Sequence, residues 1–161
     1  MARAASRDRA APDRIVAHNR KARRDYEIEE TLEVGLVLTG SEVKGLRSGG
    51  ANLNDAYAHA EGGELWLVNA HIPEYRFAGR EGHEPRRRRK LLLHRRELNR
   101  LIGSIQREGI TAIPLRIYFS DRGVAKVELG LARGRRKYEK RELEKERDWQ
   151  RQKGRLLREK G

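Results

Sequence analysis

Only the middle of this 161-residue chain carries enough apolar side chains to build a hydrophobic core. Residues 134–161 hold just five large apolar side chains, namely Tyr138, Leu143, Trp149, Leu156 and Leu157. Charge divides in the same way, with net +6 over residues 1–24, zero over residues 25–131 and +7 over residues 132–161. We therefore predict one charge-balanced folded body with two basic arms, which bury too little apolar surface to fold alone.

Several classes of protein are excluded by what the sequence lacks. Without cysteine there is no disulfide framework, thiol nucleophile or Cys-based zinc site. No apolar run approaches the roughly 18 residues of a membrane span, and the basic N-terminus lacks the apolar region of a secretory signal. The five histidines show no metal-binding spacing, and nucleotide-binding and nucleophile-elbow motifs are absent. We therefore expect no metal and no cofactor, and an enzyme is the weaker class. The formal charge of +13 favours a partner rich in phosphate.

Alternating apolar and polar residues predict five or six short strands. The first covers residues 26–38 and turns Glu33 outward on an acidic face. The last covers residues 124–132 and turns Lys126 outward. Pro114 cannot donate to a ladder, so it requires a sheet edge or a bulge. The remaining predicted strands are residues 52–59, 64–72, 89–93 (a short strand or the approach to a helix) and 113–119.

Two helices are expected between these strands. Residues 41–47 predict a short helix capped by Ser41, with Lys44 and Arg47 on its outer face. Residues 95–107 carry leucines and isoleucines at the spacing of an amphipathic helix. Short turns favour antiparallel pairing, so the predicted fold class is mostly β with short helices: a small closed OB-type barrel, or alternatively an open α+β sheet.

Three features bear on RNA binding. Residues 73–88 are polar and turn-rich, which predicts a mobile surface loop, and residues 86–90 place five cations in a row that are either solvated or in contact with phosphate. Residues 19–24 join cations to an amide that can hydrogen-bond a base, and Tyr26 offers a stacking face. Of the three leucines at 91–93, at least one must point outward, against either a base or a part of its own domain.

The motifs in this chain resemble those of the SsrA-binding protein (SmpB) family over residues 15–153. The matching stretches are 19–23, 26–30, 35–44, 46–47, 52–55, 89–93, 98–102, 126–127 and 132–141. The resemblance implies an OB-type barrel that binds the tRNA-like domain of transfer-messenger RNA (tmRNA). It further implies delivery of the alanine-charged RNA, with elongation factor Tu, to the A site of a stalled bacterial ribosome, where the nascent peptide is tagged for proteolysis. Such a protein is a cytoplasmic monomer without membrane contact, enzymatic activity or cofactor.

The resemblance assigns tmRNA binding to Glu33, Leu92 and Lys126. Lys126 is a cation for phosphate, and Leu92 is the leucine expected to pack on a base. A carboxylate repels phosphate, so Glu33 is expected to accept hydrogen bonds from base N–H groups or to orient Arg23 or Arg47. The wider set of candidate RNA contacts is Asn19, Lys21, Arg23, Tyr26, Lys44, Arg47, Arg89 and Lys90.

Three segments follow from this reading: a disordered basic arm (residues 1–14), the barrel (15–133) and a basic tail (134–161). By resemblance the tail is disordered when free and helical on the ribosome, where it occupies the decoding centre and the mRNA channel against small-subunit rRNA. Gly134 is a hinge, Tyr138 stacks on a decoding-centre base, and Glu139 stands where many members have Asp. The candidate tail residues are Gly134, Arg136, Lys137, Tyr138, Glu139, Lys140 and Arg141. A ribosome-associated structural or assembly protein that binds rRNA is the rival interpretation, and a nucleic-acid enzyme is a weaker third.

Overall fold

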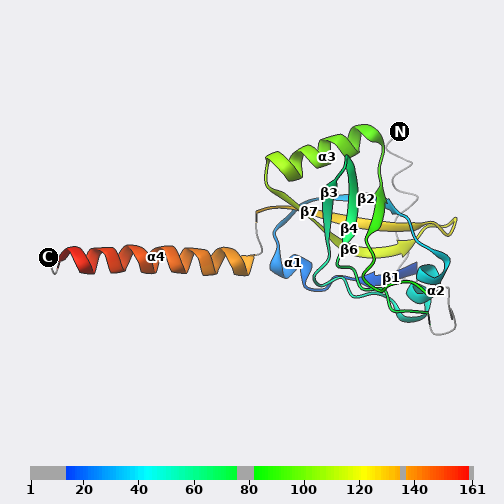
Figure 1. The fold of residues 1–161 in the computed structure, drawn as a ribbon, viewed down its shortest axis with the longest axis horizontal. Coiled ribbons are helices and arrows are strands. Elements are labelled where there is room, and N and C mark those ends of the chain that lie inside the picture. Colours follow the sequence, from blue (N-terminus) through cyan, green and yellow to red (C-terminus); the bar gives the residue numbers. More distant parts are fainter. Residues whose placement is uncertain (1–13, 76–81, 135–136, 160–161) are drawn as a thin grey trace.

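A computed structural model describes residues 14–75, 82–134 and 137–159 (Figure 1). In chain order the elements are β1 (Ile15–His18), α1 (Ala22–Asp25), β2 (Ile28–Leu36), α2 (Gly40–Gly49), β3 (Tyr57–Glu61), β4 (Glu64–Val68), β5 (Arg89–Leu92), α3 (Arg95–Arg107), β6 (Ile110–Phe119), β7 (Ala125–Arg133) and α4 (Lys137–Glu159).

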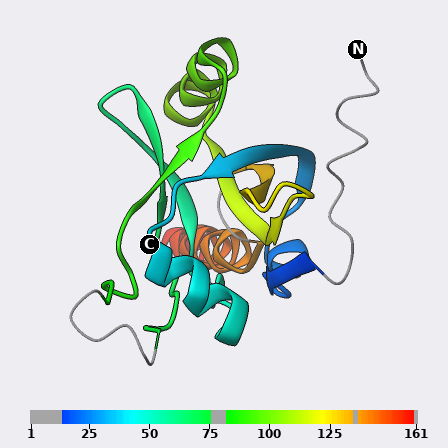
Figure 2. The same cartoon turned by 90° about the vertical axis from the view of Figure 1, so that its right-hand side faces the viewer.

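The strands form one antiparallel sheet in the order β1-β6-β7-β2-β5-β4-β3. The sheet curls until β3 contacts β6, which gives an OB-like barrel (Figure 2). Within the described residues no ladder joins β3 to β6, so packing rather than hydrogen bonding closes the barrel. The predicted fold class is confirmed, but the count of five or six strands is wrong, because the described residues form seven. The missed strand, β1, lies inside the basic segment whose charge had suggested an arm.

The barrel interior is filled by aliphatic side chains from all seven strands and from α2 and α3. A second, smaller cluster lies under α1, where Ala22 packs with Ile113 and Leu115. A bulge between Pro114 and Arg116 shifts the register of β6. This bulge sends Ile113 and Leu115 to the second cluster, and it confirms the irregularity expected at Pro114.

The two predicted helices are present, and α3 matches its predicted bounds. The predicted cap of α2 is wrong: Thr39, not Ser41, is the N-cap. Thr39 accepts a hydrogen bond from the Glu42 backbone N–H, and the Glu42 carboxylate accepts one from the Thr39 N–H at 2.9 Å, which completes a capping box. Ser41 instead hydrogen-bonds His83 Nδ1 at 3.0 Å.

The predicted mobile loop at 73–88 is only partly described, since residues 76–81 lie outside the described ranges. Residues 82–88 are anchored to α2 through His83 and Arg87, although other residues of this stretch are exposed. His83 is buried and pairs through Nε2 with the Ile72 carbonyl at 3.0 Å, and Arg87 contacts Glu42 at 2.5 Å. Polarity alone did not reveal this anchoring, because its partners lie about 40 residues upstream.

Gly45 is the point of closest approach between α2 and the segment after β4. A Cβ at this position would lie 2.5 Å from the Pro73 carbonyl oxygen, which is backbone and cannot rotate away. We expect Gly45→Ala to destabilise the fold by roughly 1–3 kcal/mol in urea unfolding, because a methyl group would overpack this contact. Gly103→Ala on α3, where a Cβ meets nothing within 4 Å, is the control and should not destabilise. Equal stability changes in the two variants would contradict this account.

Candidate nucleic-acid interface

The candidate residues Glu33 and Lys126 lie on the outer face of three neighbouring strands, β6, β7 and β2. Pairing places Glu33 opposite Glu128, and Glu128 opposite Arg116. The next row places Gly35 opposite both Lys126 and Leu92, and Lys126 opposite Tyr118. Side chains two apart on a strand share a face, so these two rows form one continuous surface.

Glu33, Leu92 and Lys126 line one open groove of about 650 Å³, which we call the leucine groove. Its other lining residues are Thr31, Leu32, Gly35, Leu93, His94 and Glu97. The three residues assigned by resemblance to tmRNA binding are therefore brought together, although they lie on three strands.

Leu92 is the outward-pointing leucine of the three, with half of its surface exposed (50%). Leu91 is buried in the core and Leu93 is half-buried. Gly35 lies directly across the ladder, and a Cβ there would come within 3.2 Å of the Leu92 Cβ. A glycine at position 35 thus leaves room for the Leu92 side chain at the groove wall.

The Glu33 carboxylate contacts two side chains, those of Lys126 and Tyr118, and the sequence did not indicate the second. Lys126 Nζ lies 3.8 Å from Oε1, and the Tyr118 hydroxyl donates a hydrogen bond to Oε2. Tyr118 is only 3% exposed, so its hydroxyl is a fixed donor. The expectation that Glu33 orients Arg23 or Arg47 is wrong: Arg23 faces Glu128 at 4.0 Å, and Arg47 stacks on Phe119 at 4.1 Å. Tyr118 was missed because only the strand register places it beside Lys126.

Four of the five cations at 86–90 form ion pairs with carboxylates of the protein itself, and one of the four is buried. Arg89 is fully buried (0% exposed) and pairs with Glu42, which is buried with it. Arg88 lies over the Trp66 ring and pairs with Glu61 at 2.5 Å, and Lys90 lies 3.7 Å from Glu64. Arg89 is therefore removed from the candidate RNA contacts, because its guanidinium is not accessible. Lys90 remains partly exposed.

Electrostatics explain how this buried pair is tolerated. Burial alone would raise the pKa of Glu42, but hydrogen bonds from Arg87, the Thr39 backbone and Arg89 outweigh it and lower that pKa to about 2. Burial lowers the pKa of Arg89, while Glu42 opposes the shift. The pair thus stays ionised at neutral pH.

Asn19 and Tyr26 are also engaged within the fold. Asn19 is 8% exposed, and its Nδ2 donates to the Leu53 and Pro114 carbonyls at 3.0 and 3.1 Å. The Nδ2 of the amide expected to hydrogen-bond a base is thus already engaged by two backbone carbonyls. Tyr26 packs half-buried against the cluster under α1, so only part of its surface is accessible.

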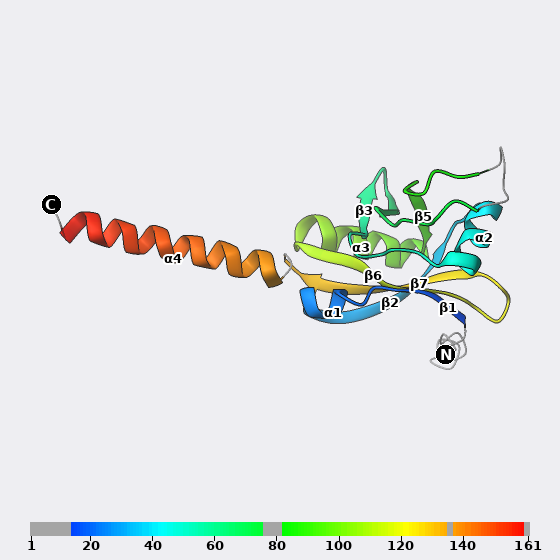
Figure 3. The same ribbon diagram turned by 90° about the horizontal axis from the view of Figure 1, so that it is seen from below.

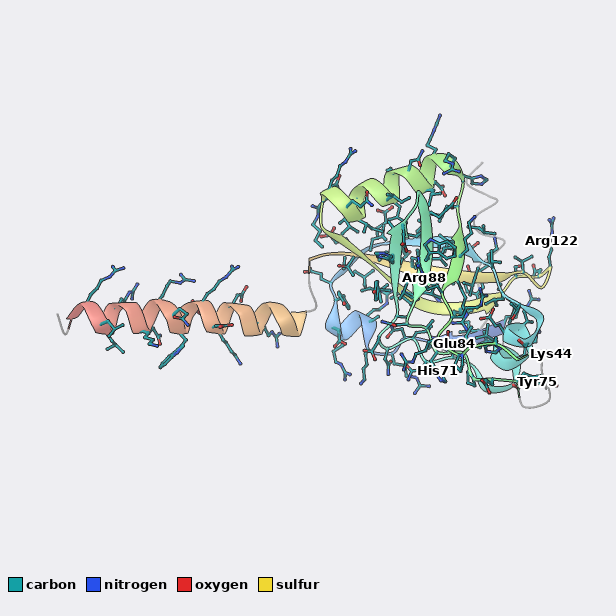
Figure 4. All side chains as sticks on the ribbon, in the orientation of Figure 1. Lys44, His71, Tyr75, Glu84, Arg88 and Arg122 are labelled. Atoms are coloured by element: carbon teal, nitrogen blue, oxygen red, sulfur yellow. The ribbon has the colours of Figure 1, made fainter. Side chains whose placement is uncertain are left out.

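The remaining barrel candidates lie apart from the leucine groove. Lys21 precedes α1 and is exposed, as is Arg23 on α1 itself. Lys44 and Arg47 are exposed on α2, where Lys44 lies 5.5 Å from the Tyr75 ring centroid (Figure 4). None of these four residues lines the leucine groove.

The tail leaves the barrel at Gly134 and continues as α4, which points away from the sheet (Figures 1 and 3). Gly134 has φ +76°, donates to the Gly109 carbonyl and accepts from the Thr111 hydroxyl at 2.9 Å. Arg136 lies outside the described residues, and the backbone of Lys137, Tyr138, Glu139 and Lys140 forms the first turn of α4. Arg141 is exposed, as is every other residue of α4 whose burial is described except Gly154.

No helix within the described ranges is long and apolar enough to cross a membrane. The same part of the chain contains no group of three or more His, Asp or Glu side chains that could hold a metal ion.

An OB-like barrel that gathers a carboxylate, a lysine and an exposed leucine in one open groove defines a nucleic-acid-binding module. The sequence profile of the family described as SmpB protein matches residues 16–159. The chain belongs to this family.

Individual relatives are similar over almost the whole chain. A protein from Sinorhizobium fredii named SsrA-binding protein is 61% identical over 148 residues, covering 92% of this chain and 93% of its own. Proteins of the same name from Sinorhizobium medicae and Agrobacterium fabrum are 62% and 61% identical, over 92% and 90% of this chain and 93% and 91% of their own. A solved structure described as "tmRNA-SmpB: a journey to the center of the bacterial ribosome" is 52% identical with a TM-score of 0.61, over 73% of this chain and 82% of its own.

Proposed function

We propose that this protein binds the tRNA-like domain of tmRNA and delivers it to the A site of stalled bacterial ribosomes for tagging of the nascent peptide. The observation that carries this proposal is the convergence of Glu33, Leu92 and Lys126 in the leucine groove of a chain that belongs to the SmpB family. The protein acts by binding rather than by catalysis, as a cytoplasmic monomer without a cofactor.

Each side chain of the groove has a distinct task in this proposal. Lys126 neutralises a backbone phosphate, and the exposed face of Leu92 packs on an unstacked base. Glu33 is an acceptor only, and Lys126 and Tyr118 already fix its position. It can accept a hydrogen bond from a base N–H group without a further loss of side-chain freedom.

The tail supplies the second half of the function. The 23 residues of α4 span about 35 Å, which is long enough to reach along the mRNA channel from the decoding centre. A basic helix without burial gains its stability from the small-subunit rRNA on which it docks. Elongation factor Tu joins the alanyl-tmRNA complex by family resemblance.

Three substitutions in the leucine groove should each weaken tmRNA binding. Lys126→Ala should also reduce the slope of log affinity against log salt by roughly 0.7–0.9, the value for one lost phosphate contact. Glu33→Gln should weaken binding without that change of slope, and so should Leu92→Ala, which removes up to about 2 kcal/mol of apolar burial against a base. Filter binding of the tRNA-like domain over a salt series measures all three.

Val37→Ala is the matched control for Leu92→Ala, since Val37 is an exposed aliphatic residue outside the groove. Wild-type affinity in all three groove variants would remove these residues from the binding site. Sequencing the RNA that copurifies with the wild-type protein tests the function itself. Recovery of rRNA without tmRNA would favour the rival role in ribosome structure or assembly.

A further inference from the structure

A second groove lies beside the leucine groove, on the same outer face of the sheet. It encloses about 300 Å³ and is called here the arginine groove. Its lining residues are His18, Asn19, Arg20, Arg23, Leu115, Arg116 and Glu128. Glu128 is two residues from Lys126 on β7 and directly opposite Glu33 on β2. The two grooves are therefore neighbouring parts of one surface.

The arginine groove has more positive than negative charge. Arg116 donates a hydrogen bond from Nε to Glu128 Oε2 at 2.9 Å, and its Nη2 forms an ion pair with the same oxygen at 2.8 Å. Arg23 Nη2 lies 4.0 Å from the other carboxylate oxygen, and Arg20 is exposed nearby. The groove thus holds three arginines and one carboxylate, and the Nη1 edge of Arg116 is not used in its contact with Glu128. Such an excess attracts an anion, and a guanidinium suits phosphate.

The floor of this groove is rigid. Ala22 of α1 is buried against Ile113 and Leu115, and this packing fixes the backbone next to Arg23. Asn19 is anchored by its two Nδ2 hydrogen bonds, and its Oδ1 is buried with no hydrogen-bond partner in the described structure.

We propose that the RNA-binding surface continues from the leucine groove across β7 into the arginine groove, where Arg23 and Arg116 bind backbone phosphates of the same RNA. Neighbouring strands are about 4.8 Å apart, so Glu33 on β2 and Arg116 on β6 are separated by about 10 Å. Glu128 is a positioning residue, because its carboxylate holds the Arg116 guanidinium on the outer face of the sheet. This inference rests on the proposed tmRNA binding and adds a second contact region to it.

The test measures affinity and salt dependence of the full-length protein for the tRNA-like domain of tmRNA. We expect Arg116→Gln and Arg23→Gln each to weaken binding roughly fivefold to tenfold. Each should also reduce the salt slope by roughly 0.7–0.9. Arg122→Gln is the matched control: Arg122 is exposed at the β6–β7 turn, away from both grooves (Figure 4), and its loss should leave affinity and slope unchanged.

The outcomes separate this inference from the function on which it rests. Absence of tmRNA binding by the wild-type protein would overturn the proposed function. Weakened binding in Lys126→Ala together with wild-type binding in both arginine variants would overturn the arginine groove alone. Equal losses in Arg116→Gln and Arg122→Gln would also overturn it, since only the net charge would then matter. Arg23 is largely exposed, so Arg23→Gln decides the question if Arg116→Gln does not fold.

Discussion

Replacing Glu42 with alanine should lower the free energy of unfolding by about 3–5 kcal/mol, the largest stability loss expected from a single substitution here. Glu42 is completely buried and pairs with Arg89, which is also completely buried, and with Arg87 at 2.5 Å. Its removal leaves the Arg89 guanidinium without a counter-charge inside the barrel and removes one half of the α2 capping box. Urea unfolding at neutral pH measures the loss.

The matched control is Glu64→Ala. Glu64 also faces two cations, Lys90 at 3.7 Å and Arg95 at 4.0 Å, but it is partly exposed. Solvent screens such contacts, so the control should change stability by less than about 1 kcal/mol. Similar losses in the two variants would contradict the structural role of the buried pair.

Low pH should destabilise the wild-type protein for the same reason, because protonation removes the negative charge of Glu42. The pKa of Glu42 is lowered in the folded state from 4.5 to about 2, so the unfolded chain binds its proton first as pH falls. The stability that Glu42 contributes is therefore fully present above pH 4.5 and is lost as pH falls to about 2. In Glu42→Gln this part of the acid dependence should disappear, and an unchanged profile would contradict the assignment.

Elements defined by local spacing could be predicted from the sequence. The apolar spacing of α3 predicted its bounds, because a helix that packs on a core shows an apolar face in its own sequence, whichever elements it packs against. The short strand β1 was missed, because its four residues lie inside a basic segment and are placed by pairing with β6. The basic run at 86–90 was expected to be either solvated or in contact with phosphate, and only the tertiary fold shows that Arg89 is buried with Glu42.

Glu33, Leu92 and Lys126 were assigned by resemblance and line one groove in the structure, but the geometry of that groove could not be predicted from the sequence. Alternation requires one of the leucines at 91–93 to point outward, and the pairing of Leu92 with Gly35 settles which one does. The partner of Glu33 depends on the register between β6 and β7, which places Tyr118 beside Lys126. Glu33 and Tyr118 are 85 residues apart in the chain, and a single sequence carries no signal that they are in contact.

Ending the chain after Gly134 should leave tmRNA binding intact and reduce peptide tagging on stalled ribosomes to background. Gly134 is retained because it is hydrogen-bonded to Gly109 and Thr111, so the cut preserves β7 and the base of β6. Both grooves lie on the barrel, whereas α4 projects away from it (Figure 1). Binding is measured at about 0.15 M ionic strength, where long-range attraction by the basic tail is largely screened.

A chain with residues 135–161 in scrambled order is the matched control, because it keeps the charge of the tail and changes only its pattern. Trp149, Leu156 and Leu157 are exposed on α4, and at spacings of seven and eight residues they lie on one side of the helix. If this face and the order of the charges recognise the ribosome, the scrambled tail should bind tmRNA and fail to support tagging. If the scrambled chain supports tagging, only the positive charge of the tail matters and its order does not. If truncation abolishes tmRNA binding, the protein is not divided into a tmRNA-binding barrel and a ribosome-binding tail.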